Sequence, residues 1–149
     1  MMPDDDRHDA EICTRAWQTL RRAHDRVARR LTADLARECA VAINDLDVLL
    51  HLRAHADEGV RITEVRDAVP LSQPALSRLV ARLVARGLVT RSEAADDGRA
   101  AVVGLTTAGG ELLDRAVEVH ARAIREALTA RFSDEEQAML LRALSQIDG

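Results

Sequence analysis

The segment from Ser72 to Gly87 restricts the possible folds of this chain more than any other part of the sequence. Ser72 is a good N-cap, Pro74 lies in the first turn, where its missing N–H costs nothing, and Gly87 stands where helices commonly end. Arg78 and Arg82 project roughly 120 to 160° away from the apolar side of this helix. That side is formed by Leu76, Leu79, Val80 and Leu83. The pattern predicts a helix with one face for a core and one cationic face.

Helices are also predicted on the N-terminal side of this segment. Apolar residues recur every three or four positions over residues 10–39, which indicates one long amphipathic helix. Asn44 is the expected N-cap of a second helix that reaches about Ala56, and Thr63 is the expected cap of a short third helix that ends before Pro70. Residues 60–62 can form only a small strand.

The C-terminal side begins with a predicted hairpin. Two β-rich runs, residues 88–93 and 101–105, flank an Asp-Gly turn signal at Asp97. Thr106 is expected to cap a long helix that runs to about Arg131, and Ser133 with Glu136 forms a capping box for a last helix. The expected fold class is mainly α with a small β-hairpin.

The charge is distributed unevenly along the chain. The formal net charge is −4, and every basic residue is an arginine. Residues 71–92 contain Arg78, Arg82, Arg86 and Arg91 but no acidic residue, so this window carries +4 and the rest of the chain −8. The overall negative charge therefore does not exclude a polyanionic partner.

Composition indicates a soluble protein that lacks a large core of its own. The only aromatic residues are Trp17 and Phe132, so Leu, Val, Ile and Ala must fill the interior, and such lean cores are often completed by a partner subunit. The acidic N-terminus does not resemble a secretory signal, and no apolar stretch approaches the roughly 20 residues that span a bilayer. We expect a cytoplasmic protein with no membrane association. Cys13 and Cys39 lack CxxC spacing and are expected to be reduced thiols.

The order of these elements suggests a helix-turn-helix with a wing. In that motif the second helix enters the DNA major groove, with small polar residues near its start and arginines for guanine or phosphate. The residues that fit this description are Gln73, Pro74, Ser77, Arg78 and Arg82. Arg99 at the hairpin tip can reach a minor groove, with its guanidinium oriented by Asp97.

Three stretches resemble the multiple-antibiotic-resistance regulator (MarR) family: residues 71–83, residues 86–89 with Asp97-Gly98-Arg99, and Leu105-Thr106 with Gly109. The resemblance implies a winged helix-turn-helix inserted between the helices of an all-α dimerisation region. It divides a single domain, residues 1–149, into a DNA-binding lobe at 44–106 and a dimerisation region at 10–40 and 107–148. It also implies a homodimer that binds pseudo-palindromic double-stranded DNA, represses transcription and is released by a small, often aromatic, effector.

Several residues allow more than one interpretation. Core packing is the favoured role for Trp17, and stacking on an aromatic ligand, in a cleft that includes His51, is the alternative. His51 and His55 have the spacing of two metal ligands, but no carboxylate or cysteine is near them in sequence. Cys13 near a helix start allows a thiol-based redox sensor, although the peroxide-sensing branch of the family supports its cysteine with tyrosines and this chain has none.

Two other classes of function are alternatives to DNA binding. A helical protein-interaction module could use an arginine ridge, formed by Arg78, Arg82 and Arg86, to bind an acidic partner. An enzyme is the least supported class, because the sequence contains no phosphate-binding loop, no nucleophile elbow and no carboxylate cluster at metal spacing. We expect no cofactor.

Overall fold

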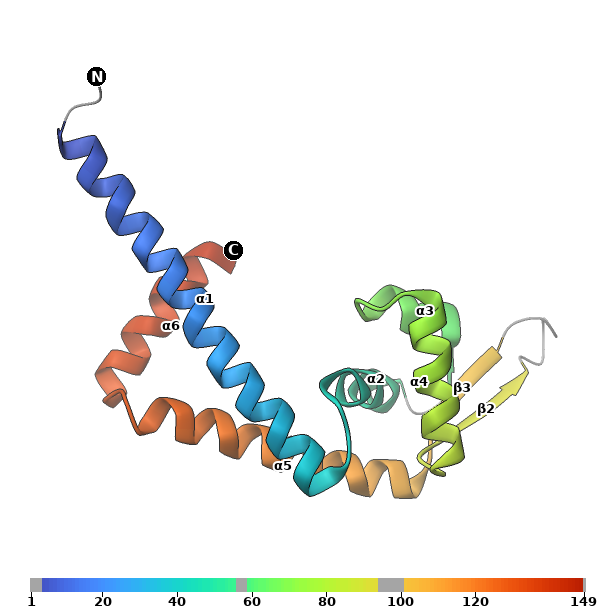
Figure 1. Ribbon diagram of the computed structural model, residues 1–149. Coiled ribbons are helices and arrows are strands. Elements are labelled where there is room, and N and C mark those ends of the chain that lie inside the picture. The colour runs from blue at the N-terminus through green and yellow to red at the C-terminus, as the bar shows by residue number, and fades with distance from the viewer. Residues whose placement is uncertain (1–3, 56–58, 94–100, 149) are drawn as a thin grey trace. The chain divides into compact units, whose positions relative to one another are not determined.

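The computed structural model describes residues 4–55, 59–93 and 101–148. The chain divides into two compact units, one formed by residues 1–33 and 122–149 and the other by residues 34–121. Each unit is described by itself. In sequence, the second unit is a continuous insertion between the two segments of the first, and Figure 1 shows the long helices α1 (Asp4–Cys39) and α5 (Thr107–Thr129) that run from one unit into the other.

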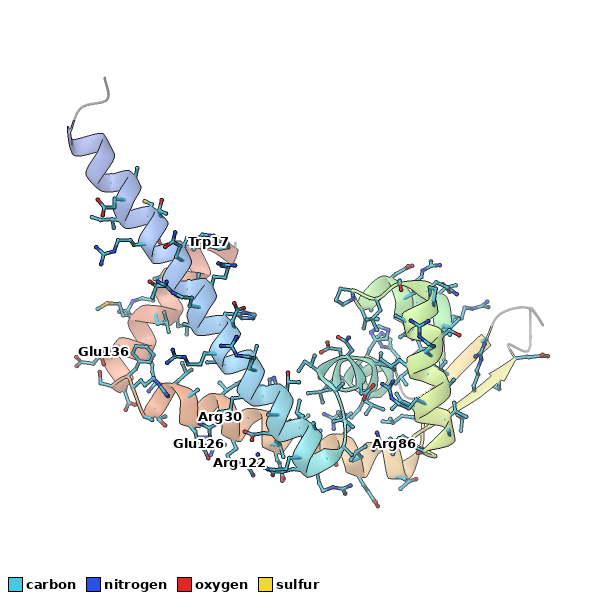
Figure 2. The ribbon with its side chains drawn as sticks, in the orientation of Figure 1. Trp17, Arg30, Arg86, Arg122, Glu126 and Glu136 are labelled. Atoms are coloured by element: carbon cyan, nitrogen blue, oxygen red, sulfur yellow. The ribbon has the colours of Figure 1, made fainter. Side chains whose placement is uncertain are left out.

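The described residues of the first unit form helices and the turn between α5 and α6. The unit comprises α1 up to residue 33, α5 from residue 122 onward, and α6 (Asp134–Asp148). An ion pair between Arg30 and Glu126 joins α1 to α5, as the labelled side chains in Figure 2 show. Ala123 and Ala127 are buried here, but many larger apolar side chains are exposed. They are Ile12, Trp17, Phe132, Met139, Leu141, Leu144 and Ile147.

The second unit combines short helices with a small sheet. Its helices α2 (Ile43–Ala54), α3 (Ile62–Ala68) and α4 (Gln73–Ala85) precede the hairpin of β2 (Val89–Glu93) and β3 (Ala101–Leu105). The short strand β1 (Val60–Arg61) pairs with the other side of β3, which gives an antiparallel sheet in the order β1-β3-β2.

The hydrophobic core lies in this second unit. Seven of its large side chains are almost fully buried: Leu35, Leu46, Leu49, Leu52, Leu76, Leu83 and Leu113. Leu35 belongs to the last turns of α1 and Leu113 to α5, so both long helices contribute to the core around α2, α3, α4 and the sheet. Leucine and valine supply this core without any aromatic ring, as the composition predicts.

Most predicted helix ends are confirmed. Ser133 and Glu136 form the expected capping box of α6, because Ser133 N–H donates to Glu136 Oε2 at 2.8 Å and Glu136 N–H donates to Ser133 Oγ at 3.3 Å. Thr106 Oγ1 accepts from Gly109 N–H at 3.0 Å, as expected of the cap of α5. Helix α1 begins at Asp4, before the predicted residue 10, where acidic residues suit a helix N-terminus.

Two predicted caps are wrong. Asn44 lies inside α2, whose N-cap is Ala42, and the Ala42 N–H donates to Asp45 Oδ2 at 2.9 Å. Thr63 lies inside α3, whose N-cap is Arg61, and no side chain bonds there. In both cases the helix starts at an isoleucine that is half-buried against the core, so packing extended the helix past the polar residue that could have capped it.

Among the described residues, no helix combines the length and the apolar character that crossing a membrane requires.

Candidate nucleic-acid interface

Helix α4 is defined by local signals at both ends. Ser72 Oγ accepts a hydrogen bond from Ala75 N–H at 3.4 Å, and Pro74 lies in the first turn. Arg86 is the C-cap, and Gly87 follows with a φ of 70°, a left-handed conformation that favours glycine. These signals fix where the helix starts and stops, and hence which residues lie on each face.

The two faces of α4 differ as the sequence predicts. Leu76, Leu79, Val80 and Leu83 are buried in the core. Gln73, Pro74, Arg78 and Arg82 are exposed on the other side of the helix, and Ser77 is half-buried. All five residues that the sequence proposes for the major groove thus lie on α4, four of them exposed and Ser77 half-buried.

The four arginines of residues 71–92 have different surroundings. Within residues 4–55, 59–93 and 101–148, Arg78 and Arg91 have no hydrogen-bond or ion-pair partner. Arg82 forms an ion pair with Asp45 of α2. Arg86, labelled at the C-terminal end of α4 in Figure 2, donates to the carbonyl oxygen of Ala40 at 2.7 Å. Two of the four arginines in the basic window thus have partners inside the protein.

The hairpin next to α4 has the predicted register. Val89 pairs with Leu105 at one end and Glu93 with Ala101 at the other. Thr106 joins the hairpin to the end of α4, since its hydroxyl donates to the Gly87 carbonyl at 2.8 Å. Asp97 and Arg99 lie outside the described residues, so their proposed roles remain predictions.

Trp17 is not a core residue of the single chain. Its side chain is 64% exposed, so the prediction of core packing is wrong, because the first unit offers no described layer that covers this face of α1. Trp17 belongs to the first unit and His51 to the second. The assignment of both residues to a ligand cleft remains a prediction.

His51 and His55 contact each other, with ring centroids 4.7 Å apart. His55 Nδ1 lies 2.9 Å from the His51 carbonyl oxygen, and His51 Nε2 is buried without a hydrogen-bond partner among the described residues. In that part of the chain no third His, Cys, Asp or Glu joins the pair in a group that could hold a metal. Cys13 is exposed and Cys39 is buried, and both are free thiols.

A family model and several solved structures relate this chain to one family. The family model described as MarR family matches residues 41–100, which include the whole of α4 and the start of the hairpin. Over these residues the chain is similar to the MarR family. A curated relative, the uncharacterized HTH-type transcriptional regulator YdgJ of Bacillus subtilis, is 30% identical over 99 residues, or 66% of this chain. The match spans 59% of the Bacillus protein, which is less than two thirds of its length.

Solved MarR-family structures share the fold over most of the chain. A MarR family transcriptional regulator from Streptomyces coelicolor, solved in complex with DNA, is 26% identical to this chain with a TM-score of 0.75. The superposition covers 91% of this chain and 84% of the Streptomyces chain. The apo form of MarR from E. coli is 22% identical with a TM-score of 0.77, covering 87% and 93% respectively. The winged helix-turn-helix fold expected from the sequence is confirmed.

The sequence interpretation missed the partners of Arg82 and Arg86. Asp45 is separated from Arg82 by 37 positions, so no local pattern links the two residues. The one available signal is the four-residue spacing of Arg78, Arg82 and Arg86, which places them on one side of α4 without showing what that side contacts.

Proposed function

We propose that this protein is a sequence-specific DNA-binding transcriptional regulator in which α4 occupies the major groove. The observation that carries this proposal is an exposed Arg78, without a partner among the described residues, next to Ser77 on the helix that a winged helix-turn-helix presents to DNA. Gln73 and Pro74 lie at the entry of this helix, and Arg82 lies one turn further along. Arg99 is proposed to reach the minor groove, with Asp97 as its support.

The functional unit is proposed to be a homodimer. The exposed apolar side chains of the first unit support this, because a single chain leaves Trp17, Met139, Leu141 and Ile147 in water. A two-fold dimer places its two recognition helices about one helical turn of DNA apart, roughly 34 Å, which fits a pseudo-palindromic site. Repression is the proposed outcome, with release of the DNA by a small aromatic effector.

The DNA-binding proposal is tested with Arg78→Ala and with a duplex that the unsubstituted protein selects from a random-sequence library. We expect a loss of about 1–3 kcal/mol in binding free energy and weaker discrimination between the selected and random duplexes. Arg115→Ala is the matched control, because Arg115 is an exposed arginine of α5 that also lacks a partner among the described residues. Fluorescence anisotropy over a range of salt concentrations measures both variants.

Equal losses for the two variants, or no binding of any duplex by the unsubstituted protein, would contradict the proposal. A protein-interaction module with an arginine ridge would give the second result. Effector binding is tested separately by titrating simple phenolic acids while the fluorescence of Trp17, the single tryptophan, is followed. Dissociation of the DNA complex at the concentrations that change this fluorescence is the expected result.

A further inference from the structure

Asp45 is a buried carboxylate at the start of α2. Its side chain is only 3% exposed, Oδ2 accepts from the Ala42 N–H at 2.9 Å, and Oδ1 accepts from Arg82 Nη2. A buried carboxylate requires a counter-charge and hydrogen-bond donors to remain ionised without a large cost. Arg82 supplies that charge and, in doing so, connects the middle of α4 to the first turn of α2.

A second connection lies one helical turn further along α4. Arg86 Nη1 donates to the Ala40 carbonyl at 2.7 Å, and Nη2 donates to the Cys39 carbonyl at 3.5 Å. The last carbonyls of a helix lack partners within the helix and carry its partial negative charge, so a guanidinium is favourable there. Ala40 has a φ of 53°, in the left-handed region that side chains with a Cβ rarely adopt, and Arg86 bonds the carbonyl of this strained residue.

The three arginines Arg78, Arg82 and Arg86 of the α4 region therefore have different roles. Arg82 and Arg86 bind residues 39–45, the segment where α1 ends and α2 begins. Arg78 has no partner among the described residues. If Arg82 moved to a DNA phosphate, it would leave Asp45 ionised and unpaired inside the protein. Arg82 is half-exposed but Asp45 is buried, and removing the counter-charge of a buried carboxylate costs more free energy than one phosphate contact at an exposed surface contributes.

We propose that Arg82 is a positioning residue for DNA binding, which acts through Asp45 to fix the orientation of α4 and does not itself contact DNA. This inference rests on the proposed function and changes one assignment within it. Because Asp45 neutralises Arg82 locally, Arg82 contributes little to the phosphate contacts that make binding depend on salt. Its effect is to hold Ser77 and Arg78 at a fixed angle to the groove.

The test is a double-mutant cycle of Arg82→Gln and Asp45→Asn on the selected duplex described above. Each single variant is expected to weaken binding to this duplex about tenfold, and the double variant is expected to bind no more weakly than either single one. The slope of log K against log salt concentration is expected to stay unchanged in all three, because no phosphate contact is lost. Arg82→Lys, which retains a positive charge for Asp45, is expected to restore most of the affinity.

A direct DNA contact by Arg82 predicts the opposite pattern. Arg82→Gln would lower the salt slope by about 0.9, while Asp45→Asn, at a residue too buried to touch DNA, would leave the affinity unchanged or raise it. Either that result or additive losses in the double variant would overturn the inference. Arg78→Ala supplies the reference for a slope change caused by a lost contact.

Hydrogen exchange without DNA separates a failure of this inference from a failure of the proposed function. Arg82→Gln is expected to raise the exchange rate of the amides of residues 40–46 at least tenfold, while those of α6 stay unchanged. Unchanged exchange at residues 40–46 would overturn the positioning role even if DNA binding is confirmed. If the unsubstituted protein binds no duplex, the proposed function fails and the DNA role of Arg82 fails with it. The exchange rates of residues 40–46 still report whether Arg82 stabilises the segment between α1 and α2.

Discussion

Gly109 illustrates how a single residue sets the junction between the hairpin and α5. A Cβ at this position would lie 2.0 Å from the Leu88 carbonyl oxygen, which is part of the backbone and cannot move aside alone. The same glycine donates its N–H to the Thr106 hydroxyl, and Thr106 in turn bonds the turn that follows α4. The close approach at Gly109 thus fixes where α5 leaves the winged helix-turn-helix.

Two neighbouring glycines give a matched prediction at this scale. Gly109→Ala is expected to destabilise the fold by about 2–3 kcal/mol because the new methyl group overlaps the Leu88 carbonyl. Gly110→Ala meets no atom within 4 Å and is expected to stabilise the helix by up to about 1 kcal/mol. Urea unfolding followed by circular dichroism measures both, and a similar effect of the two substitutions would contradict the role assigned to Gly109.

Helix α6 shows what local sequence signals contribute to a whole element. Its capping box satisfies N–H groups at both ends of the first turn, and acidic residues 134–136 complement the positive end of the helix. Because most of its side chains are exposed in the single chain, packing within the chain contributes little to this helix. Capping therefore matters more here than in α4, whose apolar face is buried.

Ser133→Ala tests this difference. The substitution removes the acceptor for the Glu136 N–H and is expected to cost about 1 kcal/mol, with a fall in Tm of roughly 2–4 °C. Ser145→Ala is the control in the same helix, because the Ser145 hydroxyl bonds only the Leu141 carbonyl one turn back and its loss is expected to be neutral or slightly stabilising. Differential scanning calorimetry compares them, and equal melting temperatures would show that the cap is not important.

At the scale of the whole molecule, the two units differ in how completely they bury their apolar residues. The second unit has a continuous core, whereas the first leaves large apolar side chains exposed on α1 and α6. A composition with only two aromatic residues predicts such a need for a partner, and the proposed homodimer would meet it.

Leu141→Glu is expected to shift the protein from dimer to monomer, because it replaces an apolar residue of the proposed dimer interface, 68% exposed in the single chain, with a charged one. Leu50→Glu makes the same chemical change at an exposed leucine of α2 in the second unit and is expected to leave the dimer intact. Sedimentation velocity at micromolar concentration measures both. A monomeric unsubstituted protein, or dimers in both variants, would contradict the proposed interface.

The sequence by itself determined the elements whose signals are local. Ser72, Gly87, Thr106 and Ser133 mark helix ends correctly because a cap or a left-handed turn depends on a few adjacent residues. The two faces of α4 follow from the helical period for the same reason. These local features, with the hairpin beside them, were enough to predict the winged helix-turn-helix and the residues of its exposed face.

Only the tertiary structure decided which arginines of that face already have partners. The pairing of Arg82 with Asp45 and of Arg86 with the end of α1 joins residues dozens of positions apart, and no periodicity specifies such contacts. Packing also moved the starts of α2 and α3 past Asn44 and Thr63, and it left Trp17 exposed where the sequence favours burial. In each case the outcome depends on what another element places nearby, and that is settled by the free energy of the whole core rather than by neighbouring residues.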